Sequence, residues 1–183
     1  MKLSILICSL EKRKDFLNRL MNVLCPQTNK YDNVQVLINT DEGQLSIGEK
    51  RNRLVEDADG EYVAYIDDDD LVSKEYVDLI MKALEEKPDV VGMMGIMTTN
   101  GRNPKTFIHS LKYDHWFEQH GIYYRCNNHL NPVKKEYASA VKFPLINMGE
   151  DHDYSNRLYQ ILKDKKEIYI PEPIYFYDYR TNK

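Results

Sequence analysis

Short apolar runs alternate with amphipathic stretches along the first half of the chain. Four apolar runs rich in β-branched and aromatic residues predict strands at residues 3–8, 34–39, 62–66 and 89–97. The stretches between them place apolar residues at positions i, i+3, i+4 and i+7, as one face of a helix requires. This alternation predicts a three-layer α/β fold, in which helices cover both faces of a mostly parallel sheet.

Local signals predict where the helices of this half begin and end. Pro26 follows an apolar helical stripe and is expected to end that helix. Ser46 and Glu49 have the spacing of a capping box, which predicts a second helix from Ser46. Ser73 is expected to cap a third helix.

The pattern weakens in the second half of the chain. Between residues 98 and 132 we expect loops and short strands, which would form a smaller antiparallel C-terminal part. Helices are predicted at residues 134–141 and 151–162. Pro171 and Pro173 interrupt a strand-like tail, which favours an edge position. With no repeat and no linker, residues 1–183 are expected to form a single domain.

Composition and net charge argue against some classes of function and some cellular locations. The 183 residues carry a formal net charge of −4, which argues against binding nucleic acid through a broad basic surface. Three cysteines without metal-site spacing favour free thiols in a reducing compartment. The N-terminus is interpreted as a first strand rather than a signal peptide, and no apolar run approaches ~20 residues. We therefore expect a cytoplasmic protein without a membrane segment.

Four consecutive carboxylates, Asp67 to Asp70, follow the third predicted strand. Ligands of open α/β sheets bind at the carboxyl ends of strands, and carboxylate oxygens suit Mg²⁺ or Mn²⁺ shared with substrate phosphates. Alternate residues of an extended chain point to opposite sides, so Asp67 and Asp69 would share one side. Asp68 and Asp70 would then be structural. The alternative is a solvated acidic loop that caps the next helix.

A basic cluster opens the second predicted helix. Lys50 and Arg51 lie in its first turn, where the helix dipole slightly disfavours cations. An anion in front of this turn would explain them, and a solvent-facing basic turn is the alternative.

A third polar cluster, Glu150, Asp151 and Asp153, lies at the start of the helix predicted from residue 151. Asp151 is well placed as an N-cap, but capping explains only one of these acids. Crowded carboxylates near a metal site could include a general base.

The three clusters, in this order, resemble motifs of the family 2 glycosyltransferases, which have the GT-A fold. They correspond to the family's Gly-x-x-Arg-Asn turn, its Asp-x-Asp strand end and its Glu-Asp acceptor-site motif. The matching segments are SIGEKRNRLVEDADGEYVAYIDDDDLVSKEYV and HLNPVKKEYASAVKFPLINMGEDHDYSNRL.

The resemblance implies transfer of a sugar from a nucleoside diphosphate sugar, with a UDP-sugar favoured, by an inverting reaction that depends on Mn²⁺ or Mg²⁺. Asp151 would be the general base, and Glu150 would orient the acceptor or serve as the second candidate for the base. Asp69 would ligate the metal, with His129 or His152 completing its shell. The residues implied to bind the donor are Ser9, Glu11, Asp41, Lys50, Arg51, Asn52, Asp67 (on the ribose) and Asp68.

The resemblance also implies that the two halves of the chain bind different substrates. Residues 1–97 would bind the nucleotide sugar, and residues 98–183 would bind the acceptor. The acceptor stays open between a saccharide, a protein side chain and a hydroxylated nucleobase. Trp116, Tyr123 and Tyr124 lie where it could dock. The processive Gln-x-x-Arg-Trp signature is absent, which favours single transfers.

Two other functions are weighed against transfer. A sugar nucleotidyltransferase would need a glycine-rich phosphate loop after the first strand, and SLEKRK contains no glycine. A non-catalytic module could instead use the acidic run to bind Ca²⁺ or a nucleotide.

Overall fold

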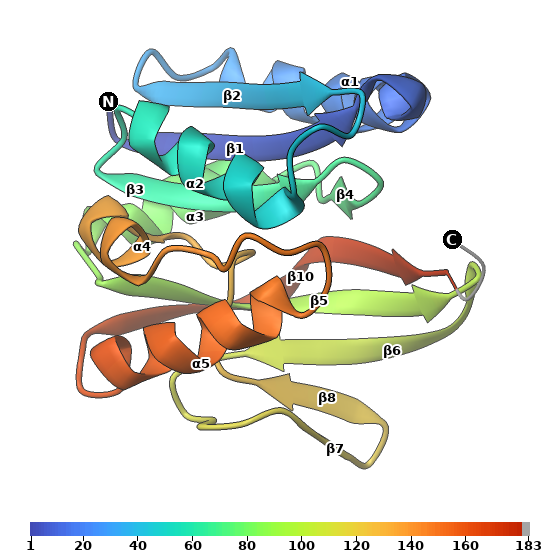
Figure 1. Cartoon of the computed structure of the whole chain (residues 1–183). Helices are drawn as coiled ribbons and strands as arrows, with labels where there is room; N and C mark the ends of the chain where they lie inside the picture. Colours follow the sequence, from blue (N-terminus) through green and yellow to red (C-terminus); the bar gives the residue numbers. More distant parts are fainter. Residues whose placement is uncertain (181–183) are drawn as a thin grey trace.

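Strands and helices alternate in the computed structural model, which describes residues 1–180 (Figure 1). The last three residues of the predicted domain, 181–183, lie outside the described part. The elements of the first half are β1 (Leu3–Leu10), η1 (Glu11–Arg13), α1 (Lys14–Thr28), β2 (Val34–Asp41), α2 (Ile47–Asp57), β3 (Tyr62–Asp67), β4 (Leu71–Val72), α3 (Tyr76–Glu85) and β5 (Val90–Thr99).

The second half begins with strands and returns to helices. Its elements are β6 (Arg102–His109), β7 (Phe117–Gln119), β8 (Ile122–Arg125), β9 (Val133–Lys134), α4 (Lys135–Val141), α5 (Glu150–Leu162) and β10 (Glu167–Tyr179). No helix of residues 1–180 is both long enough and apolar enough to cross a membrane.

The strands of the described residues form one ten-stranded sheet with the order β2-β1-β3-β9-β5-β6-β8-β7, and β10 and β4 lie off this path. Strand β1 pairs in parallel with β2 and β3, so the carboxyl ends of all three open at one edge. Strands β5 and β6 pair antiparallel, as do β7 and β8. The predicted α/β fold with a smaller antiparallel part is thus confirmed.

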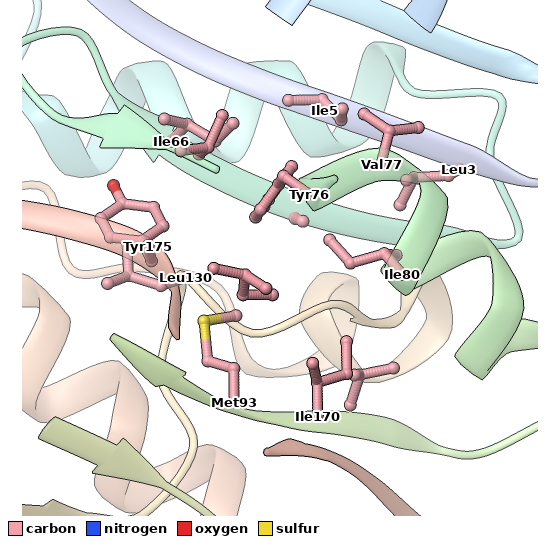
Figure 2. Packing of buried hydrophobic residues seen from close by; sticks show 14 of the residues in the cluster. Leu3, Ile5, Ile66, Tyr76, Val77, Ile80, Met93, Leu130, Ile170 and Tyr175 are labelled. Atoms are coloured by element: carbon pink, nitrogen blue, oxygen red, sulfur yellow. The ribbon is translucent and has the colours of Figure 1, made fainter. Parts of the chain in front are cut away.

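Two hydrophobic cores lie on the two faces of the sheet. On one face, Leu3 and Ile5 of β1 pack with Tyr76, Val77 and Ile80 of α3 (Figure 2). On the other face, Leu6, the next residue of opposite orientation, packs with apolar residues of α2, α4 and α5. Figure 1 shows these three helices in front of the sheet. Alternation along β1 therefore produces the predicted three layers.

The predicted start of α2 is confirmed, because Ser46 is its N-cap and Oγ accepts from Glu49 N at 3.2 Å. The prediction that Ser73 caps the third helix is wrong, because α3 begins at Tyr76 and its N-cap residue is Glu75. Ser73 Oγ accepts from Glu75 N at 3.3 Å, in the turn before the helix.

The prediction that Pro26 ends the first helix is wrong, because α1 continues to Thr28. A proline inside a helix loses one backbone hydrogen bond. The turn that follows it is held by Gln27, whose Nε2 donates to Ser73 O at 2.9 Å. Gln27 Oε1 accepts from Val77 N at 3.0 Å. The hydrogen bonds of Gln27 to α3 and to the turn before it therefore offset the free-energy cost of the proline.

The tail has the edge character that its prolines favour over most of its length, because only Tyr175 and Phe176 pair with a strand on each side. Strand β10 pairs in parallel with β5, and Tyr175 and Phe176 pair antiparallel with β4. Pro171 lies in an unpaired stretch, and Pro173 lies where the register between β5 and β10 shifts. A missing N–H is tolerated at such an irregularity because no regular ladder bond is lost there.

Candidate active site

A first cleft of about 280 Å³ opens at the carboxyl ends of β1 and β3. The end of β1, the turn after β3 and the start of α2 each contribute polar groups to it. Its lining residues are Cys8, Ser9, Leu10, Arg13, Leu45, Ile47, Lys50, Asp67, Asp68, Asp69 and Asn147.

The acidic run forms a turn rather than a continued strand. Strand β3 ends at Asp67, and Asp70 N donates to Asp67 O at 3.1 Å. Asp67 and Asp69 both line the first cleft, which agrees with their expected common side, but Asp68 lines it too, and Asp70 lines a second cleft instead. Arg13 bridges two of these neighbours, with Nη2 at 2.6 Å from Asp68 Oδ1 and 2.8 Å from Asp69 Oδ2.

Lys50 fixes the opposite wall of this cleft. It is 3% exposed, its Nζ donates to Ser9 O at 2.6 Å, and it pairs with Asp41. Burial favours the neutral form of Asp41, but hydrogen bonds from Lys50 and Leu45 N outweigh it and lower the pKa of this carboxyl. Ser9 and Lys50 thus line this cleft, whereas Asp41 is outside its lining and supports Lys50.

Arg51 lies at the centre of a buried polar network and is 2% exposed. Its guanidinium donates to Asp67 Oδ1 at 2.9 Å, to Glu150 Oε1 at 2.8 Å and to His129 Nε2 at 3.1 Å. A guanidinium only donates, so His129 Nε2 must accept. Burial alone would raise the pKa of Asp67, but the charge of Arg51 and its hydrogen bond to this carboxylate outweigh burial and lower it. The network therefore keeps Asp67 ionised.

The Gly-Glu-Lys-Arg-Asn turn at residues 48–52 organises the segment before α5. Asn52 Nδ2 donates to Phe143 O at 2.9 Å, and Asn52 Oδ1 accepts from Phe143 N at 2.7 Å. A side chain at Gly48 would collide with the carbonyl oxygen of Pro144. Neither Asn52 nor Arg51 lines the first cleft or the second cleft that adjoins it at Asp67. Both residues instead tie α2 to the chain that leads into α5.

Helix α5 begins at Glu150, one residue earlier than predicted, and its N-cap is Gly149 at φ 80°. The prediction that Asp151 caps this helix is therefore wrong, because a left-handed glycine occupies the position at no steric cost. Asp151 lies in the first turn, and its Oδ1 accepts from His152 N at 2.8 Å. Glu150 is buried, forms an ion pair with Arg51 and lines neither of the two clefts. Asp151 lines the second cleft.

A second cleft of about 480 Å³ adjoins the first, and Asp67 lines both. Asp151 and His129 face this second cleft, together with aromatic side chains from the antiparallel part of the sheet. The lining residues are Asp67, Asp70, Met97, Thr99, Trp116, Tyr123, Arg125, Asn128, His129, Leu130, Asp151, Tyr177 and Tyr179.

Residues of the weakly patterned segment 98–132 contribute strongly to the second cleft. Trp116 and Tyr123 line it, whereas Tyr124 stacks on Phe117 with ring centres 5.0 Å apart. Arg125 was not among the predicted site residues. The signal that could have found it is a lone cation after the paired aromatics Tyr123 and Tyr124.

The predicted metal ligands lie in different places. Asp69 lines the first cleft, His129 faces the second, and His152 is exposed, with its ring 5.0 Å from that of Trp116. Glu11, predicted near the nucleobase, is exposed and lines neither cleft. Across residues 1–180, no three His, Cys, Asp or Glu side chains form a ready-made metal cage.

The donor chemistry of the first cleft nevertheless fits a hard cation. Asp67, Asp68 and Asp69 bring three carboxylates into one open cleft. Mg²⁺ and Mn²⁺ are typically bound by one or two carboxylates, with water and substrate phosphates completing the shell.

Comparisons with solved structures agree with this fold. The chain aligns with TarS 1–349 from S. aureus in complex with UDP-GlcNAc at a TM-score of 0.71 and 17% identity, covering 100% of this chain and 60% of that one. TarS 1–349 in complex with UDP gives 0.68 and 17%, covering 97% and 60%. The longer S. aureus TarS structure gives 0.67 and 18%, covering 97% and 37%. This chain thus spans 60% of the TarS 1–349 structures, and at such identities the likeness shows the fold.

A family comparison is more specific. No curated protein matches the chain. The family model described as glycosyl transferase family 2 matches residues 27–142, which include the turn at residues 48–52 and the carboxylates after β3. The match covers more than half of the 183 residues. The chain belongs to glycosyl transferase family 2.

Proposed function

We propose that the chain transfers one sugar from a nucleoside diphosphate sugar to an acceptor hydroxyl, with inversion and with Mn²⁺ or Mg²⁺. The observation that carries this proposal is that the two clefts meet at Asp67, with the carboxylate turn in one and Asp151 in the other. A UDP-sugar is the favoured donor, because the TarS structures of similar fold hold UDP-GlcNAc and UDP.

The first cleft would take the nucleotide. Asp67 would bind the ribose, and Asp69, with Asp68 beside it, would hold the metal. When bound, the metal neutralises the charge that develops on the departing diphosphate. Lys50 and Arg13 add two cationic side chains to the lining of the same cleft, where Lys50 pairs with Asp41 and Arg13 with Asp68 and Asp69.

The second cleft would take the acceptor, with Asp151 as the general base. Asp151 removes the proton from the acceptor hydroxyl while that oxygen bonds to the anomeric carbon. The bond from this carbon to the diphosphate oxygen breaks in the same displacement, so the configuration inverts. A base that works in this way must lie within hydrogen-bond reach of the hydroxyl that it deprotonates.

Arg51 and Glu150 act through other residues in this proposal. Arg51 is bonded to Asp67 and to Glu150, so the pair joins the donor side to the start of α5, which carries Asp151. Residues 1–97 would then form the donor half and the rest of the chain the acceptor half. The exceptions to this division are Asn147 in the first cleft and Asp67, Asp70 and Met97 in the second.

Titration calorimetry of UDP with and without Mn²⁺ tests the donor site. UDP is expected to bind the wild-type protein at least about tenfold more tightly with Mn²⁺, because charge-assisted contacts contribute ~1.5–3 kcal/mol. Asp69→Asn should remove this difference, since it removes a carboxylate charge at the metal. The matched control is Asp164→Asn, an exposed acid outside both clefts.

Three results would contradict the proposal. If UDP binds equally with and without Mn²⁺ in the wild type and in Asp69→Asn, the metal has no role at this site. If Ca²⁺ binds while no nucleotide does, the chain is the non-catalytic module considered above. Binding of a nucleoside triphosphate together with a sugar phosphate would favour the nucleotidyltransferase.

A further inference from the structure

Arg125 at the end of β8 places a guanidinium in the second cleft. Its Cζ atom lies 4.5 Å from the ring centre of Trp116 and 5.7 Å from that of Tyr123. Arg13 and Arg51 at the same end of the sheet are each held by carboxylates. Within residues 1–180, the side chain of Arg125 has these aromatic contacts but no hydrogen-bond acceptor and no ion-pair partner.

The N–H groups of such a guanidinium are available to a hydrogen-bond acceptor on a bound ligand. The guanidinium carries five N–H donors and stays charged at any physiological pH, so leaving it half-buried without an acceptor costs free energy. Burial lowers the pKa of Arg125, which reflects the lost solvation, while Asp151 acts in the opposite direction. Aromatic contacts restrict the guanidinium without using its N–H groups, which suits bidentate binding of a carboxylate or a phosphate.

The other charges of this cleft leave room for an anion. Asp67 is compensated by Arg51 at 2.9 Å, and Asp70 accepts from Tyr175 Oη at 2.7 Å. Asp151 is the carboxylate of this cleft whose charge acts on Arg125. The cleft thus pairs the proposed base with a cation that is held by aromatic rings.

We infer that the acceptor carries an oxyanion, either a phosphate or a carboxylate, near the hydroxyl that receives the sugar, and that Arg125 binds this oxyanion. The inference rests on the proposed function, because the role of Asp151 marks the second cleft as the acceptor site. It makes Arg125 a residue that determines acceptor specificity. Within each acceptor class open from the sequence, it favours phosphorylated or acidic members over neutral ones.

A matched set of three probes tests the inference on the full chain with UDP and Mn²⁺ present. Methyl glucoside is neutral, its 6-phosphate carries a phosphate, and methyl glucuronide carries a carboxylate. By titration calorimetry or ligand-observed NMR, at least one anionic probe is expected to bind about tenfold or more tighter than the neutral probe. The better of the two anionic probes identifies which oxyanion the cleft prefers.

Two variants and one control assign the effect to Arg125. Arg125→Gln should abolish the preference for the anionic probe, and Arg125→Lys should retain part of it, because a lysine keeps the charge but loses the planar fork. Arg102→Gln, an exposed arginine on β6, should behave as the wild type. Thermal unfolding of each protein checks that the fold is intact.

Equal binding of all three probes to the wild type would overturn the inference. So would Arg125→Gln weakening UDP as much as it weakens the anionic probe, since Arg125 would then belong to the donor site. Failure of the proposed function is distinguishable, because the wild type would then either not bind UDP or bind it no more tightly with Mn²⁺ than without it.

Discussion

Replacing Asp151 with asparagine is expected to lower the rate of sugar transfer by about 10²–10⁴-fold, the range typical of a lost general base. UDP affinity should stay close to that of the wild type, because Asp151 lines the second cleft and not the first. The measurement is UDP release during transfer, compared with calorimetric binding of UDP to the same protein. An effect on rate without an effect on nucleotide binding would identify a group that acts in the chemical step.

Asp153→Asn is the matched control for this prediction. Asp153 lies in the same first turn of α5, but it pairs on the surface with Arg157 at 2.6 Å and lines neither cleft. Its loss should change the transfer rate by less than about tenfold, since an exposed ion pair contributes only ~0.2–1 kcal/mol. If Asp151→Asn turns over as fast as Asp153→Asn, Asp151 is not the base.

Arg51→Met is expected to lower the free energy of unfolding by about 3–5 kcal/mol, the cost of breaking a buried ion pair by removing one partner. The substitution leaves the buried Glu150 without its cation and removes the charge that faces Asp67. Denaturation with urea, followed by circular dichroism, measures the change. Arg53→Met is the control, because Arg53 lies two residues along the same helix in an exposed pair with Glu49.

The difference in unfolding free energy between the wild type and Arg51→Met is also expected to depend on pH. Arg51 lowers the pKa of Asp67 in the folded state, so the stabilisation is present in full above the unfolded-state pKa of about 3.9. It is lost as the pH falls from there toward the folded pKa. The gap in stability between wild type and Arg51→Met should therefore be smaller at pH 3 than at pH 7. A loss below about 1 kcal/mol at pH 7 would mean that Arg51 makes only surface-type contacts.

The elements that could be predicted from the sequence are those whose pattern of apolar residues lies within one short stretch of the chain. The buried strand β1 and the helix start at Ser46 follow from short stretches of sequence. Pro26 shows the limit of such reasoning, because the contacts of Gln27 with a distant turn decide where α1 ends. The position of the tail likewise depends on pairing with β5, which sequence proximity does not reveal.

The candidate site divides in the same way. Residue types and order predicted which stretches meet, and Asp67, Asp69 and Lys50 do share one cleft. The direction of a side chain was not predictable where its partner lies far along the chain. Arg51 turns inward because Glu150, 99 residues away, provides a buried carboxylate. Arg125 lies in a segment without a period, so only the tertiary structure brings it beside Asp151.

Release of nucleoside diphosphate from a panel of nucleoside diphosphate sugars tests the central claim most directly. With water as the acceptor, the wild-type chain is expected to hydrolyse at least one UDP-sugar slowly in the presence of Mn²⁺, and to stop when the metal is chelated. Asp151→Asn should release less diphosphate from that same sugar. If no sugar of the panel yields diphosphate above the rate without protein, with Mn²⁺ or Mg²⁺ present, then the paired clefts do not form a glycosyltransferase site.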